Sequence, residues 1–172
     1  MGKTLIPKGG NDRIMTPDPL AQWIVDYFMP TGHVLEPCSG DGAFIRAFLN
    51  WKDQLHPSAL TISSCEIDEG LDFFNVNDAD HYDWIITNPP YSKFTAFLKH
   101  SMQVADNVVF LCLENAFFQK ARLRAMKEKN FGFVEIIHVE TPPKPWPQFG
   151  LQVGVVHIKK DYTGETKIKY AN

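Results

Sequence analysis

The residues with the clearest potential for chemistry follow an apolar stretch near the middle of the chain. Residues 83–87 have the composition of a β-strand, and Asn88, Pro89, Pro90 and Tyr91 follow directly. The prolines lack backbone donors and fix φ, which keeps the carbonyl groups before them out of a helix. The side-chain oxygen of Asn88 and the backbone oxygen of Pro89 can then accept both hydrogens of a planar amino group. Tyr91 adds a flat face for stacking, although an ordinary Asn-Pro turn is the alternative.

A second motif, upstream, predicts a strand, a loop of small residues and the start of a helix. Residues 33–36 end at Glu36, residues 37–43 are small, and apolar side chains then recur at helical spacing. Gly40 and Gly42 permit positive φ and a close approach of ligand to backbone. The loop has neither dinucleotide nor P-loop spacing. Glu36 favours a ligand with an ammonium group, such as the methionine end of S-adenosylmethionine, and a plain glycine-rich turn is the alternative.

In this order, the two motifs resemble those of the S-adenosylmethionine-dependent amino-methyltransferases, in particular the N6-adenine DNA methyltransferases, whose hallmark is Asn-Pro-Pro-Tyr. The resemblance covers about residues 16–160. It implies that Thr16 and Pro17 close over the methionine part of the cofactor, although they also suit the N-cap and first position of a helix at residues 20–28. The other implied cofactor contacts in these motifs are Glu36, Cys38, Gly40, Gly42 and Asn88. The implied catalytic residues are Asn88, Pro89, Pro90 and Tyr91.

Further cofactor contacts are expected at the end of the next strand, which is predicted at residues 60–68. Glu66 lies about two dozen residues beyond the glycine loop, where an acid can accept ribose hydroxyls, and Ile67 would pack on the adenine. The resemblance implies that Asp72 accepts from the adenine amino group and that Phe73 flanks the ring. The family usually has a helix between these two elements, so we expect a shortened sheet edge here. A solvated strand end and a core role for Phe73 are the alternatives.

The remainder of the chain alternates helices and strands. We expect helices at residues 93–104 and 119–129 and strands at residues 108–113, 133–139 and 153–158. This alternation predicts an α/β fold with a mostly parallel sheet and helices on both faces. No helix separates the last two strands, so the last one is expected to be antiparallel. The resemblance implies the Rossmann-like class I methyltransferase fold, with ligands at the carboxyl ends of the strands.

A proline-rich loop at residues 141–150 is a second candidate for substrate contact. Trp146 and Phe149 are large apolar groups in a segment that we expect to be exposed. The resemblance implies that a residue of this loop packs on the extruded base opposite Tyr91, and we assign that role to Phe149 or Trp146. A Trp146 side chain folded onto the core is the alternative.

Composition predicts one domain over residues 1–172, since 172 residues with 44% hydrophobic side chains can form one core. No apolar run approaches membrane-spanning length and no signal peptide is recognisable, so we expect a cytoplasmic protein without a membrane partner. Three cysteines without a C-x-x-C pattern predict a reducing compartment and no metal site.

The predicted reaction is direct methyl transfer to N6 of adenine in DNA, with the base flipped out of the duplex. The net charge of −3 gives no support to nucleic-acid binding. The sequence also lacks a segment long enough for target recognition, so we expect recognition from a partner subunit or low specificity, as in an enzyme that modifies DNA broadly to evade restriction. The alternatives are methylation of an RNA base or of a protein glutamine amide, and a non-catalytic cofactor-binding subunit of a methyltransferase complex.

Overall fold

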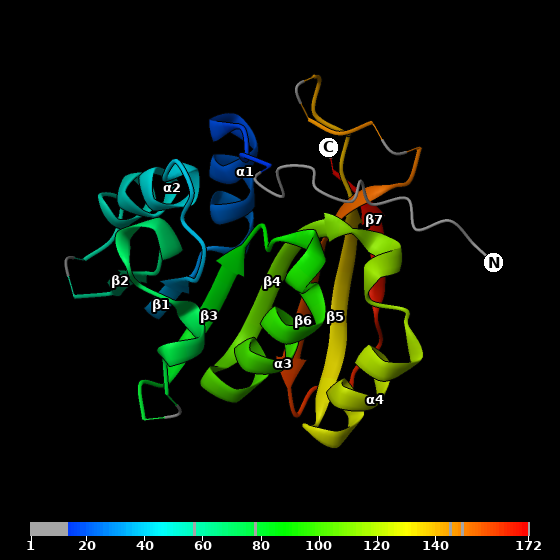
Figure 1. Cartoon of the computed structure of the whole chain (residues 1–172). Helices are drawn as coiled ribbons and strands as arrows, with labels where there is room; N and C mark the ends of the chain where they lie inside the picture. The colour runs from blue at the N-terminus through cyan, green and yellow to red at the C-terminus, as the bar shows by residue number, and fades with distance from the viewer. Residues whose placement is uncertain (1–13, 57, 78, 145, 149, 172) are drawn as a thin grey trace.

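A mixed sheet of seven strands is formed by the residues that the computed structural model describes, which are 14–56, 58–77, 79–144, 146–148 and 150–171 (Figure 1). The strands are β1 (Gly32–Glu36), β2 (Leu60–Ser64), β3 (Tyr82–Thr87), β4 (Ala105–Leu113), β5 (Phe131–His138), β6 (Val153–Lys160) and β7 (Lys167–Tyr170). The helices are α1 (Asp18–Phe28), α2 (Ala43–Lys52), α3 (Phe94–Val104) and α4 (Lys120–Glu128).

The sheet order is β2-β1-β3-β4-β6-β5-β7, and every neighbouring pair is parallel except those that involve β6. The expected α/β architecture and the antiparallel strand at residues 153–158 are therefore confirmed. β6 lies inside the sheet because it pairs with both β4 and β5. It is not the last strand of the chain, since β7 follows it and pairs in parallel with β5 at the edge of the sheet. The sequence analysis did not predict β7.

The sheet edge beside β2 is shortened, as expected. The described part of residues 65–81 forms two short 3₁₀ turns, η1 (Ile67–Glu69) and η2 (Phe73–Asn75), in place of a helix and a strand. The cavity described below therefore has a wall of turns on this side.

Apolar side chains cover both faces of the sheet. Ile86 and Val109 pack with residues of α1 and α2, whereas their neighbours Ile85 and Val108 pack with residues of α3 and α4. This alternation follows from the two-residue period of a strand, and burial on both faces explains the continuous apolar runs in β3 and β4. The chain segments that leave the carboxyl ends of β1, β2 and β3 are therefore anchored to a sheet that is packed on both faces.

None of the helices in the described ranges is both long enough and apolar enough to cross a lipid bilayer.

Candidate active site

A cavity of about 530 Å³ opens at the carboxyl ends of β1, β2 and β3. This volume lies within the range of about 300–1,000 Å³ that is usual for small-molecule sites. Three segments that follow these strands line it, together with residues 14–16, which precede α1. The structure thus brings the glycine loop and the Asn-Pro-Pro-Tyr segment to one cavity, at the sheet edge where ligands bind in open parallel sheets.

Most of the predicted site residues line this cavity. They are Thr16, Cys38, Gly40, Glu66, Ile67, Asp72, Phe73, Asn88, Pro89, Pro90 and Tyr91. Pro17, Glu36, Gly42 and Trp146 do not line it. Phe149 lies outside the described residues.

Glu36 is buried behind the glycine loop. Its side chain is 1% exposed, and Oε1 accepts hydrogen bonds from Thr87 Oγ1 at 2.5 Å and from the Cys38 N–H at 3.1 Å. Burial raises the pKa of this carboxyl from 4.5 to about 8, against the opposing effect of these hydrogen bonds, so the group is largely protonated at pH 7. The expectation that Glu36 faces a ligand ammonium group is therefore wrong. Glu36 instead fixes the glycine loop to β3.

Cys38 continues this connection toward the cavity. Its Sγ lies 3.0 Å from Thr87 Oγ1 and 3.4 Å from the backbone oxygen of Asn88. Burial, followed by the proximity of Glu36, raises the pKa of the thiol well above its usual value, so Cys38 remains a neutral thiol. The contacts of Glu36, Cys38 and Thr87 therefore couple the position of the glycine loop to that of Asn88.

The two glycines of the loop have different roles. Gly40 has a φ of +54°, and a β-carbon there would lie 3.1 Å from Met15 Sδ, so a side chain would crowd the cavity. Gly42 has a φ of +85° and is the N-cap of α2. Gly42 is not among the residues that line the cavity, and it starts α2; its contact with the cofactor stays a prediction.

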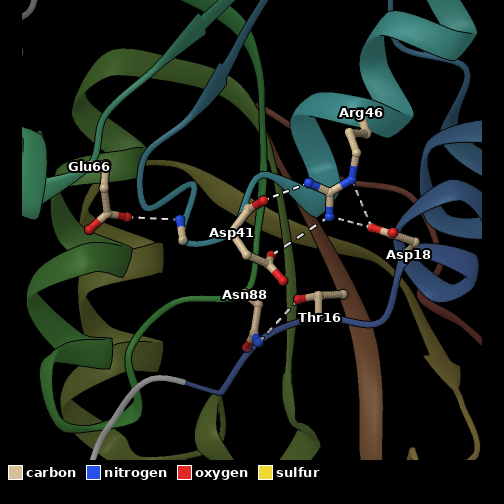
Figure 2. A network of polar contacts seen from close by, with 7 residues as sticks. Thr16, Asp18, Asp41, Arg46, Glu66 and Asn88 are labelled. Carbon is tan, nitrogen blue, oxygen red and sulfur yellow. Dashed lines mark hydrogen bonds and ion pairs between the residues drawn. The ribbon is translucent and has the colours of Figure 1, made fainter.

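The segments after β2 form the wall opposite the loop. Glu66 Oε2 accepts a hydrogen bond from the Gly40 N–H at 2.8 Å, which joins this wall to the loop (Figure 2). Asp72 Oδ1 accepts from the Phe74 N–H at 3.0 Å and so caps the turn η2. A carboxylate has further lone pairs, so both acids keep the capacity to accept hydrogen bonds from a ligand.

Apolar side chains complete this wall. Ile67, Leu71 and Phe74 line the cavity and are 57%, 53% and 36% exposed. Phe73 is only 2% exposed and packs against Phe97 with a ring separation of 5.1 Å, so it belongs chiefly to the core. Sequence reasoning missed Leu71, and of the two neighbouring phenylalanines it chose Phe73 for the cavity although Phe74 is the more exposed. The apolar residue before Asp72 in this strand-end loop could have indicated Leu71.

Asn88 is anchored by the segment that precedes α1. Its Nδ2 donates to the backbone oxygen of Ile14 at 2.8 Å. The same nitrogen donates to Thr16 Oγ1 at 3.3 Å (Figure 2). α1 begins at Asp18 with Pro17 as its N-cap, so the alternative interpretation, with Thr16 as the N-cap and Pro17 as the first helical residue, is wrong by one position. The Thr16 hydroxyl is therefore available to Asn88 rather than to the helix.

An ion pair holds the start of α1 beside the glycine loop. Arg46 Nη2 lies 2.6 Å from Asp18 Oδ1, and Arg46 Nη1 donates to the backbone oxygen of Asp41 at 2.6 Å (Figure 2). The three residues come from α1, the loop and α2. Sequence reasoning did not identify this contact, which joins residues far apart in the chain.

Trp146 does not contribute to the cavity. Its side chain is 4% exposed and belongs to the apolar cluster that contains Val139 and Val153. The expectation of an exposed Trp146 that stacks on a base is therefore wrong, and the alternative, a side chain folded onto the core, is the observed arrangement. Burial of its large indole surface explains this position.

Comparison with known proteins shows similarity in structure. No protein-family model and no curated protein matches the sequence. A protein from Listeria monocytogenes assigned as a class I S-adenosylmethionine-dependent methyltransferase superposes with a TM-score of 0.71 at 13% identity, over 92% of this chain and 66% of that one. A protein from Vibrio vulnificus, assigned as the modification subunit of a type I restriction enzyme, superposes with a TM-score of 0.62 at 18% identity. The match covers 94% of this chain and 48% of that one.

A protein from Pyrococcus horikoshii assigned as an RNA methyltransferase gives a TM-score of 0.57 at 16% identity, over 86% of this chain and 83% of that one. The chain thus spans less than two thirds of the Listeria and Vibrio proteins and most of the Pyrococcus protein. At these identities the similarity concerns the fold. The chain has a Rossmann-like class I methyltransferase fold, as the sequence resemblance implied.

Proposed function

We propose that this protein transfers a methyl group from S-adenosylmethionine to a planar amino nitrogen, and that the substrate is N6 of adenine in DNA. One observation carries the proposal. Asn88, Pro89, Pro90 and Tyr91 line the same cavity as the glycine loop that follows β1. An acceptor pair for an amino group therefore lies beside a loop suited to a small ligand.

The residues of the cavity fit the cofactor. Gly40 leaves backbone space that a β-carbon would fill, next to the Met15 side chain, and it suits the methionine part. Glu66 would accept the ribose hydroxyls, and the rim residues Ile67 and Phe74 would hold the adenine ring, with Asp72 as acceptor for its amino group. The cofactor supplies an electrophilic methyl group on a sulfonium, which is an excellent leaving group.

The role of the chain is to hold and polarise the target amine. Asn88 Oδ1 and the Pro89 carbonyl oxygen accept its two N–H groups, which directs the nitrogen lone pair toward the methyl donor and stabilises the positive charge that develops on nitrogen. Tyr91 stacks on the flat target group. An adenine must leave the duplex to reach this position, at a cost of roughly a few kcal/mol. The released proton passes to water.

The comparisons support a nucleic-acid substrate and a partner. The Vibrio protein is assigned as the modification subunit of a type I restriction enzyme. We therefore propose first that the substrate is DNA and that a separate subunit recognises the target. The net charge of −3 agrees with recognition by a partner, because the chain offers no overall positive field for DNA. An RNA base is the second candidate, because the chain covers 83% of the Pyrococcus protein assigned as an RNA methyltransferase.

The test is transfer of labelled methyl groups to duplex DNA, single-stranded DNA, RNA and a protein extract, with each label traced to its atom. We expect N6-methyladenine from DNA, and a loss of about 100-fold or more for Asn88→Ala, as for removal of other groups that stabilise transition-state charge. Asn50→Ala, on the exposed side of α2, is the matched control and should retain activity.

Equal transfer by Asn88→Ala would refute the role of Asn88. Label only in RNA or glutamine would replace the substrate, and cofactor binding without any transfer would indicate a missing partner or a regulatory subunit.

A further inference from the structure

We infer that residues 14–16 set the orientation of the Asn88 amide so that the site selects an amino group over an oxo group, with the Ile14 backbone oxygen as the group that decides the orientation and Thr16 as a positioning residue that holds the amide in it. This inference rests on the proposed function and names a determinant of its specificity. The resemblance assigned Thr16 to the cofactor. The contacts of its hydroxyl point instead to Asn88.

The orientation of the amide follows from the chemistry of its neighbours. The backbone oxygen of Ile14 can only accept a hydrogen bond, so the amide nitrogen of Asn88 must face it, at 2.8 Å. Thr16 Oγ1, at 3.3 Å from the same nitrogen, accepts the second hydrogen. Because a hydroxyl can also donate, this contact stabilises the orientation that the Ile14 oxygen sets and does not select it alone. Residues 14–16 then accept both hydrogens of the amide nitrogen. The amide oxygen, Oδ1, keeps a lone pair that can accept a hydrogen bond from a target N–H group.

Orientation matters because the terminal torsion of asparagine is broad and nearly two-fold, so the two amide orientations are similar in energy without specific partners. With Oδ1 presented, Asn88 accepts from a target N–H. With the amide reversed, an NH2 group would face the target, which repels an amine and instead binds an oxo oxygen. The contacts from residues 14–16 therefore disfavour the orientation that would bind an oxo group.

The segment itself is held in place by its burial and by an ion pair that follows it. Thr16 is 7% exposed, so its hydroxyl lies in a confined position. Two residues further on, Asp18 pairs with Arg46, which also binds the backbone of Asp41 in the glycine loop (Figure 2). An exposed ion pair alone contributes little stability. Here it connects the start of α1 to the loop and so limits the movement of Thr16 relative to Asn88.

The test compares Thr16→Val, Thr16→Ser and Thr166→Val. Valine keeps the shape of threonine without the acceptor, and serine restores it. Thr166 also forms one hydrogen bond, to the backbone of Phe133 near the opposite end of the sheet, so Thr166→Val is a matched loss away from the cavity. Steady-state methyl transfer gives kcat, and calorimetry gives the Kd for S-adenosylhomocysteine.

We expect Thr16→Val to lower kcat about 5- to 10-fold, the effect of losing one hydrogen bond of about 1 kcal/mol that positions a reacting group. Its cofactor Kd should change less than about 2-fold, Thr16→Ser should recover most of kcat, and Thr166→Val should match the wild type. An unchanged kcat for Thr16→Val overturns the inference, as does a loss of kcat matched by an equal loss of cofactor affinity, which would make Thr16 a cofactor contact.

A second readout addresses selectivity. The amino group of the substrate that the wild type methylates is replaced by an oxo group, as in hypoxanthine for adenine, and the ratio of the two binding constants is compared between proteins. We expect Thr16→Val to reduce the preference for the amino form, and an unchanged ratio overturns the inference. If the wild type methylates no amino substrate, the proposed function fails first and this inference fails with it. Transfer by the wild type with no effect of Thr16→Val removes this inference alone.

Discussion

Replacing Glu36 by glutamine should remove a pH dependence from the stability of this fold. Glu36 lies fully buried between the glycine loop and β3, with Thr87 and Cys38 as its hydrogen-bond donors. Glutamine has the same shape and keeps a carbonyl acceptor for both donors, but it cannot ionise. Glu36→Gln therefore isolates the effect of the buried carboxyl on folding.

The magnitude follows from the two pKa values of the group. Burial raises the pKa of Glu36 from 4.5 to about 8 in the folded protein. Between these values the folded state holds a proton that the unfolded chain releases, so the stabilising contribution is complete below about pH 4.5 and is lost as pH rises toward 8. At 1.36 kcal/mol per pH unit, the upper limit of this loss is about 5 kcal/mol.

His157 acts in the opposite direction over part of this range. Burial lowers the pKa of this imidazole from 6.5 to about 4, so its contribution is gained as pH rises from about 4 to 6.5. The wild-type profile alone therefore mixes two effects. The difference between wild type and Glu36→Gln cancels the histidine, since both proteins contain it.

The assay is urea denaturation at pH 5, 6.5 and 8, followed by tryptophan fluorescence. We expect the two proteins to differ by about 1 kcal/mol at pH 5, the usual effect of altering a hydrogen bond. By pH 8, the free energy of unfolding of Glu36→Gln should have risen relative to the wild type by about 3 kcal/mol. Parallel profiles from pH 5 to 8 would refute the reasoning, because they would mean that Glu36 ionises at its ordinary pKa in the folded protein.

Two further substitutions test ligand binding in the cavity and the stability of the fold separately. Glu66→Gln should weaken S-adenosylmethionine binding about 10-fold in calorimetry, because a neutral amide is a weaker acceptor than a carboxylate for ribose hydroxyls and for Gly40 N–H; unchanged affinity would exclude Glu66 from the site. Gly154→Ala places a β-carbon 2.5 Å from the Glu114 side chain, which pairs with His138. It should lower the free energy of unfolding by about 1–3 kcal/mol in urea denaturation, and no loss would mean that Glu114 has room to move.

The fold was predictable from the sequence because its strands are apolar runs separated by helical patterns. β3, β4 and β6 carry such runs, since both faces of the sheet are covered. β7 escaped prediction because Lys167–Tyr170 is short and largely exposed, and its pairing with β5 depends on a partner that is distant in sequence.

The site was predictable as two motifs but not as a set of contacts. Sequence shows an acid after each of two strands, yet only the packing shows that Glu36 is buried whereas Glu66 faces the cavity. The contact between Thr16 and Asn88 joins residues 72 positions apart, and no local pattern predicts it. Trp146 was misplaced for a similar reason, because the exposure of a loop side chain depends on the tertiary surface available to it.

The measurement that tests the central claim most directly is a crystal structure with S-adenosylhomocysteine bound. The account predicts that the ligand occupies the cavity after β1, β2 and β3, with its ribose hydroxyls on Glu66, its methionine part along Gly40 and its sulfur directed toward the Asn88 side chain. A ligand bound at another place, or a protein that binds none at millimolar concentration, would contradict the assignment of this cavity as the active site of a methyltransferase.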